Sequence, residues 1–98
     1  MGLLSRQRPR SFLEWRQLRD WSRLPDREVN VPGYLLRAAR EEEGFTQTQL
    51  AAKLGISQQA VARAERWTSN PTVELLGRWA RACGRRLELS LQVPTKDA

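Results

Sequence analysis

Residues 44–65 read GFTQTQLAAKLGISQQAVARAE, and this stretch decides the fold of the chain. Thr46 begins a first helix, because Gln49 follows three residues later and the two form a capping box. Ser57 is a typical N-cap and begins a second helix. Gly55 opens the short turn between them, where the backbone needs positive φ. The pattern therefore predicts two short capped helices joined by a tight turn.

The side chains of this stretch divide into a packing set and an exposed set. Large apolar or small residues occupy the positions where the two helices meet, namely Leu50, Ala51, Leu54, Ile56, Val61 and Ala64. The first turn of the second helix is polar and uncharged, with Gln58 and Gln59 followed by an alanine. A glutamine amide offers one donor and one acceptor that match N7 and N6 of adenine. This composition is expected of a helix end that enters the major groove of DNA.

The pattern TQxxLAxKLGxSQQxVxxxE resembles the lambdoid-repressor and Cro-like (Xre-type) helix-turn-helix family over about residues 35–84. The resemblance implies base contacts from Gln58, Gln59 and Arg63. It implies phosphate contacts from Gln47, Thr48, Lys53 and Ser57. It also implies that Arg40 and Glu65 form a structural ion pair and not a DNA site.

Two features depart from the family pattern. In the family a glycine usually follows soon after the glutamate that corresponds to Glu65, whereas this chain continues Arg66-Trp67-Thr68-Ser69. The chain is therefore expected to leave the second helix along a different path from that of the family. The basic excess also lies mostly outside the motif, in Arg6, Arg8, Arg10, Arg85 and Arg86. These arginines have two interpretations, either solvated surface charges or additional phosphate contacts.

The flanking sequence predicts further helices. Residues 1–10 are expected to be a disordered basic tail, and residues 11–31 an N-terminal helical extension, from Ser11 to about residue 23, with a linker. Its apolar arc comprises Leu13, Trp15, Leu18, Trp21 and Leu24, which pack on the chain itself or fill a partner's groove. Residues 32–84 are expected to be the DNA-binding domain, with helices over about 32–43, 46–54, 57–66 and 72–83.

The periodicity changes after Gly84. Apolar residues alternate with polar ones at Leu87, Leu89, Leu91 and Val93, which predicts a half-buried strand. Residues 85–98 are therefore expected to consist of a strand for dimerisation and a C-terminal tail. A single strand needs a second strand to pair with, and two copies of the chain can pair antiparallel through Leu87, Leu89 and Leu91. The intrachain alternative is residues 28–31, whose strand pattern is weak. The fold class expected is all-α, a bundle of four to five helices with this one C-terminal strand.

Composition excludes several classes of function. The chain has 17 Lys and Arg against 11 Asp and Glu, no His and one Cys, and it has no glycine-rich phosphate loop. No catalytic constellation can be assembled from this set, so we expect no enzyme, no metal and no cofactor. Cys83 lies at helical spacing from Leu76 and Trp79, which indicates a core residue. Without an apolar run of membrane length or a signal peptide, the expected location is the cytoplasm.

These observations together predict a sequence-specific DNA-binding transcriptional regulator, a repressor that binds an inverted-repeat operator as a homodimer. A helix-turn-helix followed by one strand also resembles, more loosely, antitoxins that repress their own operon and cap a toxin protein. A stand-alone or phage-type regulator stays open beside that role. The alternative is a protein-interaction module that neutralises a partner enzyme and binds DNA weakly or not at all. Salt-dependent binding to random DNA distinguishes the two classes.

Overall fold

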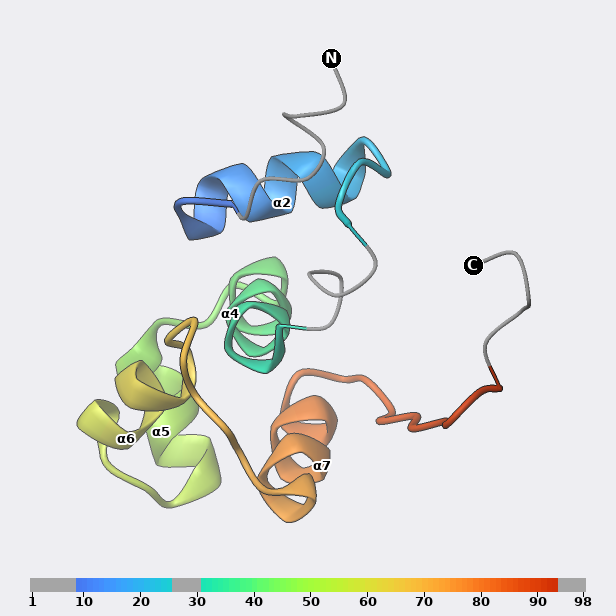
Figure 1. Ribbon diagram of the computed structural model, residues 1–98. Helices are drawn as coiled ribbons and strands as arrows, with labels where there is room; N and C mark the ends of the chain where they lie inside the picture. The colour runs from blue at the N-terminus through green and yellow to red at the C-terminus, as the bar shows by residue number, and fades with distance from the viewer. Residues whose placement is uncertain (1–8, 26–30, 94–98) are drawn as a thin grey trace.

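The computed structural model describes residues 9–25 and 31–93 (Figure 1). All regular secondary structure within these residues is helical, and no strand occurs among them. The helices are α2 (Phe12–Asp20), α4 (Pro32–Glu42), α5 (Gln47–Leu54), α6 (Gln58–Ala64) and α7 (Val73–Ala82). The predicted helical bundle is therefore confirmed, with helix ends within about two residues of the expected ones except in α2.

The capping signals read from the sequence are present. The Thr46 hydroxyl accepts from the backbone N–H of Gln49 at 3.0 Å, and the Gln49 side chain accepts from the backbone N–H of Thr46 at 2.9 Å. The Ser57 hydroxyl accepts from the backbone N–H of Ala60 at 3.0 Å. Gly55 has φ of 69°, the left-handed conformation that ends α5. Local chemistry thus sets both ends of the turn between α5 and α6.

The main core lies between α4, α5, α6 and α7. Its buried residues are Leu36, Leu50, Ala51, Leu54, Val61, Ala64, Trp79 and Cys83. The Trp79 side chain is fully buried, and its indole N–H donates to the backbone carbonyl of Leu36 at 3.0 Å. This bond ties α7 to α4, because a buried indole N–H needs an acceptor. The interpretation of Cys83 as a core residue is confirmed, since it too is fully buried.

The N-terminal helix α2 packs on α4 through a second, aromatic cluster. Phe12 and Trp15 are buried there and contact the ring of Tyr34, whose centroid lies 5.5 Å from each. The Arg37 guanidinium lies over the Phe12 ring at 4.2 Å. Ion pairs extend the contact, including Arg16 with the carboxylate of residue 41 at 3.1 Å. Packing on the chain itself, one of the two interpretations of the apolar arc, therefore holds for Trp15.

The predicted membership of that arc was wrong in part. Leu13 and Trp21 are 62% and 59% exposed, whereas Phe12, which the arc omitted, is 4% exposed. The helix ends at Asp20, so Trp21 is its C-cap and no longer follows the helical repeat. The remaining buried face is the pair Phe12 and Trp15, which are three residues apart on one side of the helix.

The C-terminal segment, residues 85–93, has no regular secondary structure, in contrast to the predicted strand. Leu87 is half-buried, but Leu89 and Leu91 are 64% and 104% exposed. A strand is defined by its ladder, and no segment within residues 9–25 and 31–93 pairs with this one. The intrachain alternative, residues 28–31, lies outside the described residues except for Val31, which is the N-cap residue of α4 and is buried.

Candidate nucleic-acid interface

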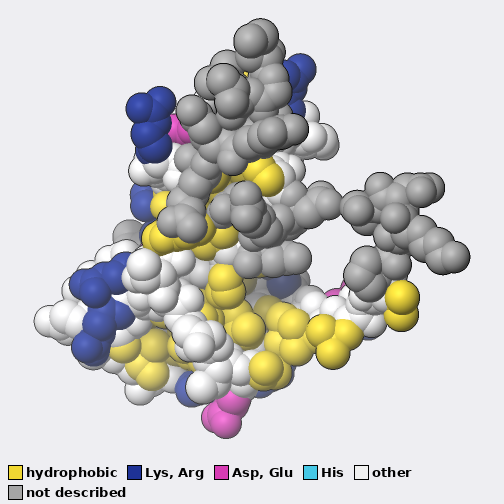
Figure 2. All heavy atoms as spheres, in the orientation of Figure 1, with side chains coloured by type: hydrophobic (Ala, Val, Ile, Leu, Met, Phe, Trp, Pro, Cys, Tyr) yellow, Lys and Arg dark blue, Asp and Glu magenta, His cyan; other side chains and the backbone are white. Residues whose placement is uncertain are grey.

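A shallow surface depression lies along α6 and the residues that flank it. Ser57, Gln58 and Gln59 are exposed, and with Ala62, Arg63 and Arg66 they line a depression of about 500 Å³. Arg63 and Arg66 form no ion pair within the described part of the chain. Figure 2 shows Lys and Arg side chains gathered over the end of the molecule that α5 and α6 form. Polar amides and uncompensated positive charge therefore meet on this surface.

Behind this surface lies the ion pair between Arg40 of α4 and Glu65, the C-cap of α6. Two parallel bonds join the side chains, Nε to Oε2 at 2.5 Å and Nη2 to Oε1 at 3.0 Å. The third guanidinium nitrogen donates to the backbone carbonyl of Phe45 at 2.8 Å. Arg40 and Glu65 are 8% and 6% exposed, and their hydrogen bond raises the pKa of Arg40 above its ordinary value. The structure thus places these two residues in a buried pair that joins α4 to the end of α6.

Two further hydrogen bonds extend from this pair to the surface. The Gln47 side-chain amide donates from Nε2 to Oε1 of Glu65 at 3.1 Å. Gln58 in turn donates from its own Nε2 to Oε1 of Gln47 at 2.7 Å. The residues Arg40, Glu65, Gln47 and Gln58 therefore form one chain of hydrogen bonds, which we call the relay. The sequence pattern indicates the pair of Arg40 and Glu65 but not its links to Gln47 and Gln58, because residues 47 and 65 meet only after the helices pack.

The remaining predicted site residues lie nearby but do not join the relay. Thr48 is exposed, and Ser57 is engaged as the cap of α6. The Lys53 ammonium lies 5.1 Å from the centroid of the Phe45 ring, a cation–π contact. Gln59 and Arg63 are exposed on α6 itself.

Several arginines outside the motif are engaged in ion pairs. Arg85 binds Glu42 at 2.9 Å and Glu43 at 3.4 Å. Arg86 binds Glu88 at 2.6 Å, although both side chains are largely exposed. Residues 6 and 8 lie outside the described residues. For residues 85 and 86 the carboxylate partners favour a surface-charge role over a phosphate contact.

The segment after α6 leads the chain back toward α4. The helix ends at Ala64, whose carbonyl accepts from the hydroxyl of Ser69 at 2.6 Å. Trp67 turns back onto α4, and its ring centroid lies 6.2 Å from that of Tyr34. The aromatic cluster under α2 therefore also holds the end of α6.

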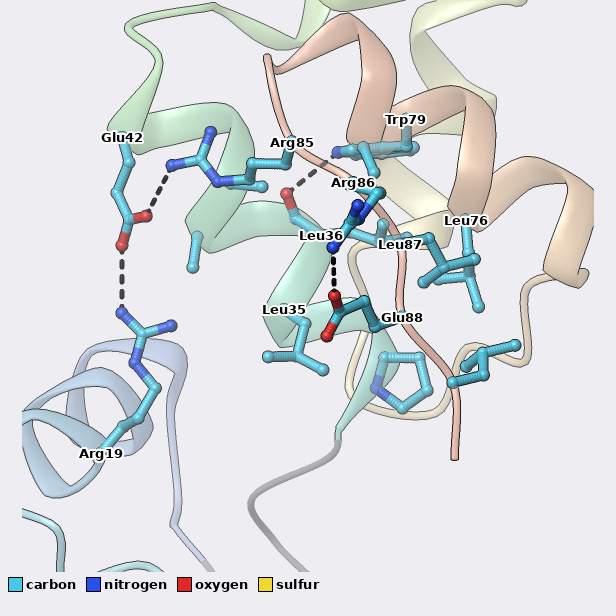
Figure 3. A pocket seen from close by; sticks show the side chains of 15 residues that line it. Arg19, Leu35, Leu36, Glu42, Leu76, Trp79, Arg85, Arg86, Leu87 and Glu88 are labelled. Atoms are coloured by element: carbon cyan, nitrogen blue, oxygen red, sulfur yellow. Dashed lines mark hydrogen bonds and ion pairs between the residues drawn. The ribbon is translucent and has the colours of Figure 1, made fainter. Parts of the chain in front are cut away.

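A separate groove of about 390 Å³ lies between α4, α7 and the C-terminal segment (Figure 3). Its lining is mainly apolar and includes Leu35, Leu36, Leu76, Trp79, Leu87 and Leu89. At one side Glu42 binds both Arg19 of α2 and Arg85, at 3.0 and 2.9 Å, so that the carboxylate links the N-terminal and C-terminal parts of the chain. Figure 2 shows hydrophobic side chains exposed along the C-terminal segment beside it.

The single thiol of the described residues, that of Cys83, is buried. Burial raises the pKa of the Cys83 thiol, which disfavours a nucleophilic thiolate. No cluster of three or more potential metal ligands occurs within residues 9–25 and 31–93. In the same ranges no helix has the length and apolar character that a membrane span requires.

Comparison with known proteins gives a family and two kinds of relative. The helix-turn-helix family matches residues 36–89, more than half of the chain. Antitoxin HigA1 of Mycobacterium tuberculosis, in two strains, is 38% identical over 60 residues, which is 61% of this chain and 40% of that protein. An uncharacterized HTH-type transcriptional regulator of Methanothermobacter thermautotrophicus is 39% identical over 51 residues, 52% of this chain and 74% of that protein. This chain thus spans about two fifths of the length of the antitoxin relatives, and no solved structure matches it significantly.

Proposed function

This chain belongs to the helix-turn-helix family, and on that premise we propose that it is a sequence-specific DNA-binding transcriptional regulator that acts as a repressor. The observation that carries the proposal is the exposed start of α6, where Gln58 and Gln59 lie beside Arg63 and Arg66, two cations without an ion-pair partner among the described residues. In this proposal α6 enters the major groove and α5 crosses the phosphate backbone.

The proposal gives the exposed residues two kinds of contact. Gln58, Gln59 and Arg63 contact base edges, because amide and guanidinium groups match the donors and acceptors there. Phosphates are bound by Gln47, Thr48, Lys53 and Ser57. Base contacts distinguish sequences, whereas phosphate contacts hold the protein in register and add affinity for any duplex.

The first prediction separates these two kinds of contact. The reference duplex is the sequence that the parent protein selects from a random pool, here called the selected duplex. Gln58→Ala or Gln59→Ala should cost about 1–3 kcal/mol of binding free energy on it, and the preference for one base should weaken at one position. Lys53→Ala should weaken binding to the selected and scrambled duplexes alike and reduce the salt dependence by about one charge. Fluorescence titration of each variant against both duplexes measures this. Equal losses on the two duplexes for the glutamine variants would remove them from base recognition.

We further propose that the regulator acts as a homodimer joined through residues 85–93. The exposed Leu89 and Leu91 of this segment, with Leu87, supply an alternating apolar face that an antiparallel copy can cover. Pairing centred on Leu89 places each Leu87 opposite the partner's Leu91. A two-fold axis there sets two recognition helices about one DNA turn apart, roughly 34 Å, so the operator is an inverted repeat.

The second prediction tests this dimer. Leu89→Pro should give monomers in sedimentation and lose operator binding, because proline cannot donate to a ladder. The helical circular dichroism should persist, since residue 89 lies outside every described helix. Leu13→Gln is the matched control, because Leu13 is exposed to the same degree but lies on α2. A dimeric Leu89→Pro variant would move the contact elsewhere, with the exposed Trp21 the next candidate.

A second candidate role is that of an antitoxin that regulates its own operon. The identity of 38% with an antitoxin, over residues that include most of this chain, favours it. The groove between α4, α7 and the C-terminal segment then offers an apolar surface for a toxin protein, in addition to the DNA surface on α6. A stand-alone regulator lacks such a partner. An interaction module that neutralises an enzyme lacks the DNA surface, and the titrations at varied salt distinguish it.

A further inference from the structure

We propose that the buried carboxylate of Glu65 sets the direction of the relay and thereby makes Gln58 prefer adenine over guanine. Glu65 is in this view a positioning residue that acts on base choice without touching DNA. The inference rests on the proposed function, since it concerns how the same surface on α6 selects its sequence.

The direction of the hydrogen bonds in the relay is set by two groups that can act only as donor or only as acceptor. An arginine can only donate hydrogen bonds, and an ionised carboxylate can only accept them. Oε1 of Glu65 accepts from Arg40 at 3.0 Å and from Gln47 at 3.1 Å. The bond from Gln47 must therefore come from its amide nitrogen, whichever way that amide is otherwise free to turn.

The direction then passes outward through the Gln47 amide. With its nitrogen held by Glu65, the amide oxygen lies toward Gln58, and the two side chains are 2.7 Å apart at Nε2 of Gln58 and Oε1 of Gln47. An amide oxygen accepts but does not donate. Gln58 is therefore also held with its nitrogen inward, although it is itself exposed.

What remains free on Gln58 is one N–H and the amide oxygen. Adenine presents an acceptor, N7, and a donor, N6, which match these two groups. Guanine presents two acceptors, N7 and O6, and would need two donors from the amide. Because one N–H of Gln58 is bound to Gln47, the held amide has only one donor to give. The relay thus favours adenine and disfavours guanine at the base that Gln58 contacts.

The test is selection from a pool of duplexes with a randomised central window, followed by titration of duplexes that differ only by adenine or guanine at one position. That position is identified as the one where Gln58→Ala abolishes preference. Glu65→Gln replaces the carboxylate with an amide that can present either atom, so Gln47 and Gln58 are free to turn. We expect the ratio of adenine to guanine affinity to fall about tenfold there, with the other positions unchanged.

A double variant separates direction from stability. Glu65→Gln combined with Gln47→Glu places the carboxylate at position 47, where it can only accept from Gln58, and the new amide at position 65 can donate to it. The adenine preference should return to within about twofold of the parent ratio. The affinity of the double variant for every duplex should be lower than that of the parent protein, because the negative charge at position 47 lies near the phosphates. A merely structural role for Glu65 would not restore the ratio in this way.

A third variant guards against misfolding. If circular dichroism shows Glu65→Gln to be unfolded, Gln47→Met breaks the relay outside the buried pair and should lose the same preference. An unchanged ratio of adenine to guanine affinity in a folded Glu65→Gln variant, or in Gln47→Met, would overturn the inference alone. A parent protein that selects no sequence would overturn the proposed function, and the inference with it.

Discussion

Glu65→Ala is expected to lower the free energy of unfolding by about 3–5 kcal/mol, because it leaves the buried guanidinium of Arg40 without its charge partner. Arg40 is 8% exposed and retains its bond to the backbone carbonyl of Phe45 and a longer ion pair with Glu41 at 3.7 Å. Gln47 loses an acceptor at the same time. Urea unfolding followed by circular dichroism measures the change, and the midpoint should fall without a change of slope.

The exposed pair of Arg86 and Glu88 is the matched control for this variant. Its bond of 2.6 Å is about as short as the shortest bond of the buried pair, but the two side chains are 85% and 75% exposed. Surface pairs contribute little, so Glu88→Ala should change stability by at most about 0.5 kcal/mol. Small and equal losses for the two variants would show that the Arg40 and Glu65 pair is not buried in solution.

Gly33→Ala is expected to lower the free energy of unfolding by about as much as Glu65→Ala, by about 3 kcal/mol or more, because the added Cβ overlaps backbone atoms that have no room to move. An ideal Cβ at Gly33 lies 2.0 Å from the carbonyl oxygen of Arg66 and 2.9 Å from the carbonyl carbon of Glu65. The glycine thus lets α4 touch the end of α6 directly. Thermal and urea unfolding of the variant measure the loss.

Gly77→Ala serves as the control at a second buried helical glycine. The nearest atoms to its added Cβ are the side chain of Arg81 at 3.5 Å and that of Leu87 at 3.9 Å, which are ordinary contacts. Since alanine favours the helix over glycine, this variant should be neutral or more stable by up to about 1 kcal/mol. A Gly33→Ala variant that unfolds like the Gly77→Ala variant would show that α4 and the end of α6 are farther apart than in the structure.

The parts of the fold that sequence predicts well are those with local causes. The capping box of Thr46 and Gln49, the cap at Ser57 and the turn at Gly55 involve residues three or fewer apart, and all are present. The buried face of α2 was harder to predict. A helical wheel drawn from Ser11 onward assumes a helix that continues, whereas α2 ends at Asp20 and leaves Trp21 exposed.

The parts that sequence does not predict depend on contacts between distant segments. The bond between Gln47 and Glu65 joins residues 18 apart, and no local pattern indicates which way the amide faces. Gly33 reads as an unremarkable residue near the start of a helix, and only the packing of Arg66 against it explains the glycine. The strand expected over residues 86–93 depends on a ladder with a second copy, which no local pattern within one chain supplies.

Whether the start of α6 recognises DNA sequence is decided by titrating the parent protein with its selected duplex and with a scrambled duplex of equal length across a range of salt concentrations. A sequence-specific regulator should bind the selected duplex at least about a thousandfold more tightly. The logarithm of each affinity should fall linearly with the logarithm of salt concentration, because binding releases counterions from phosphates. Affinities that are equal for the two duplexes, or binding that is absent at low salt, would contradict such recognition and favour a protein-interaction module.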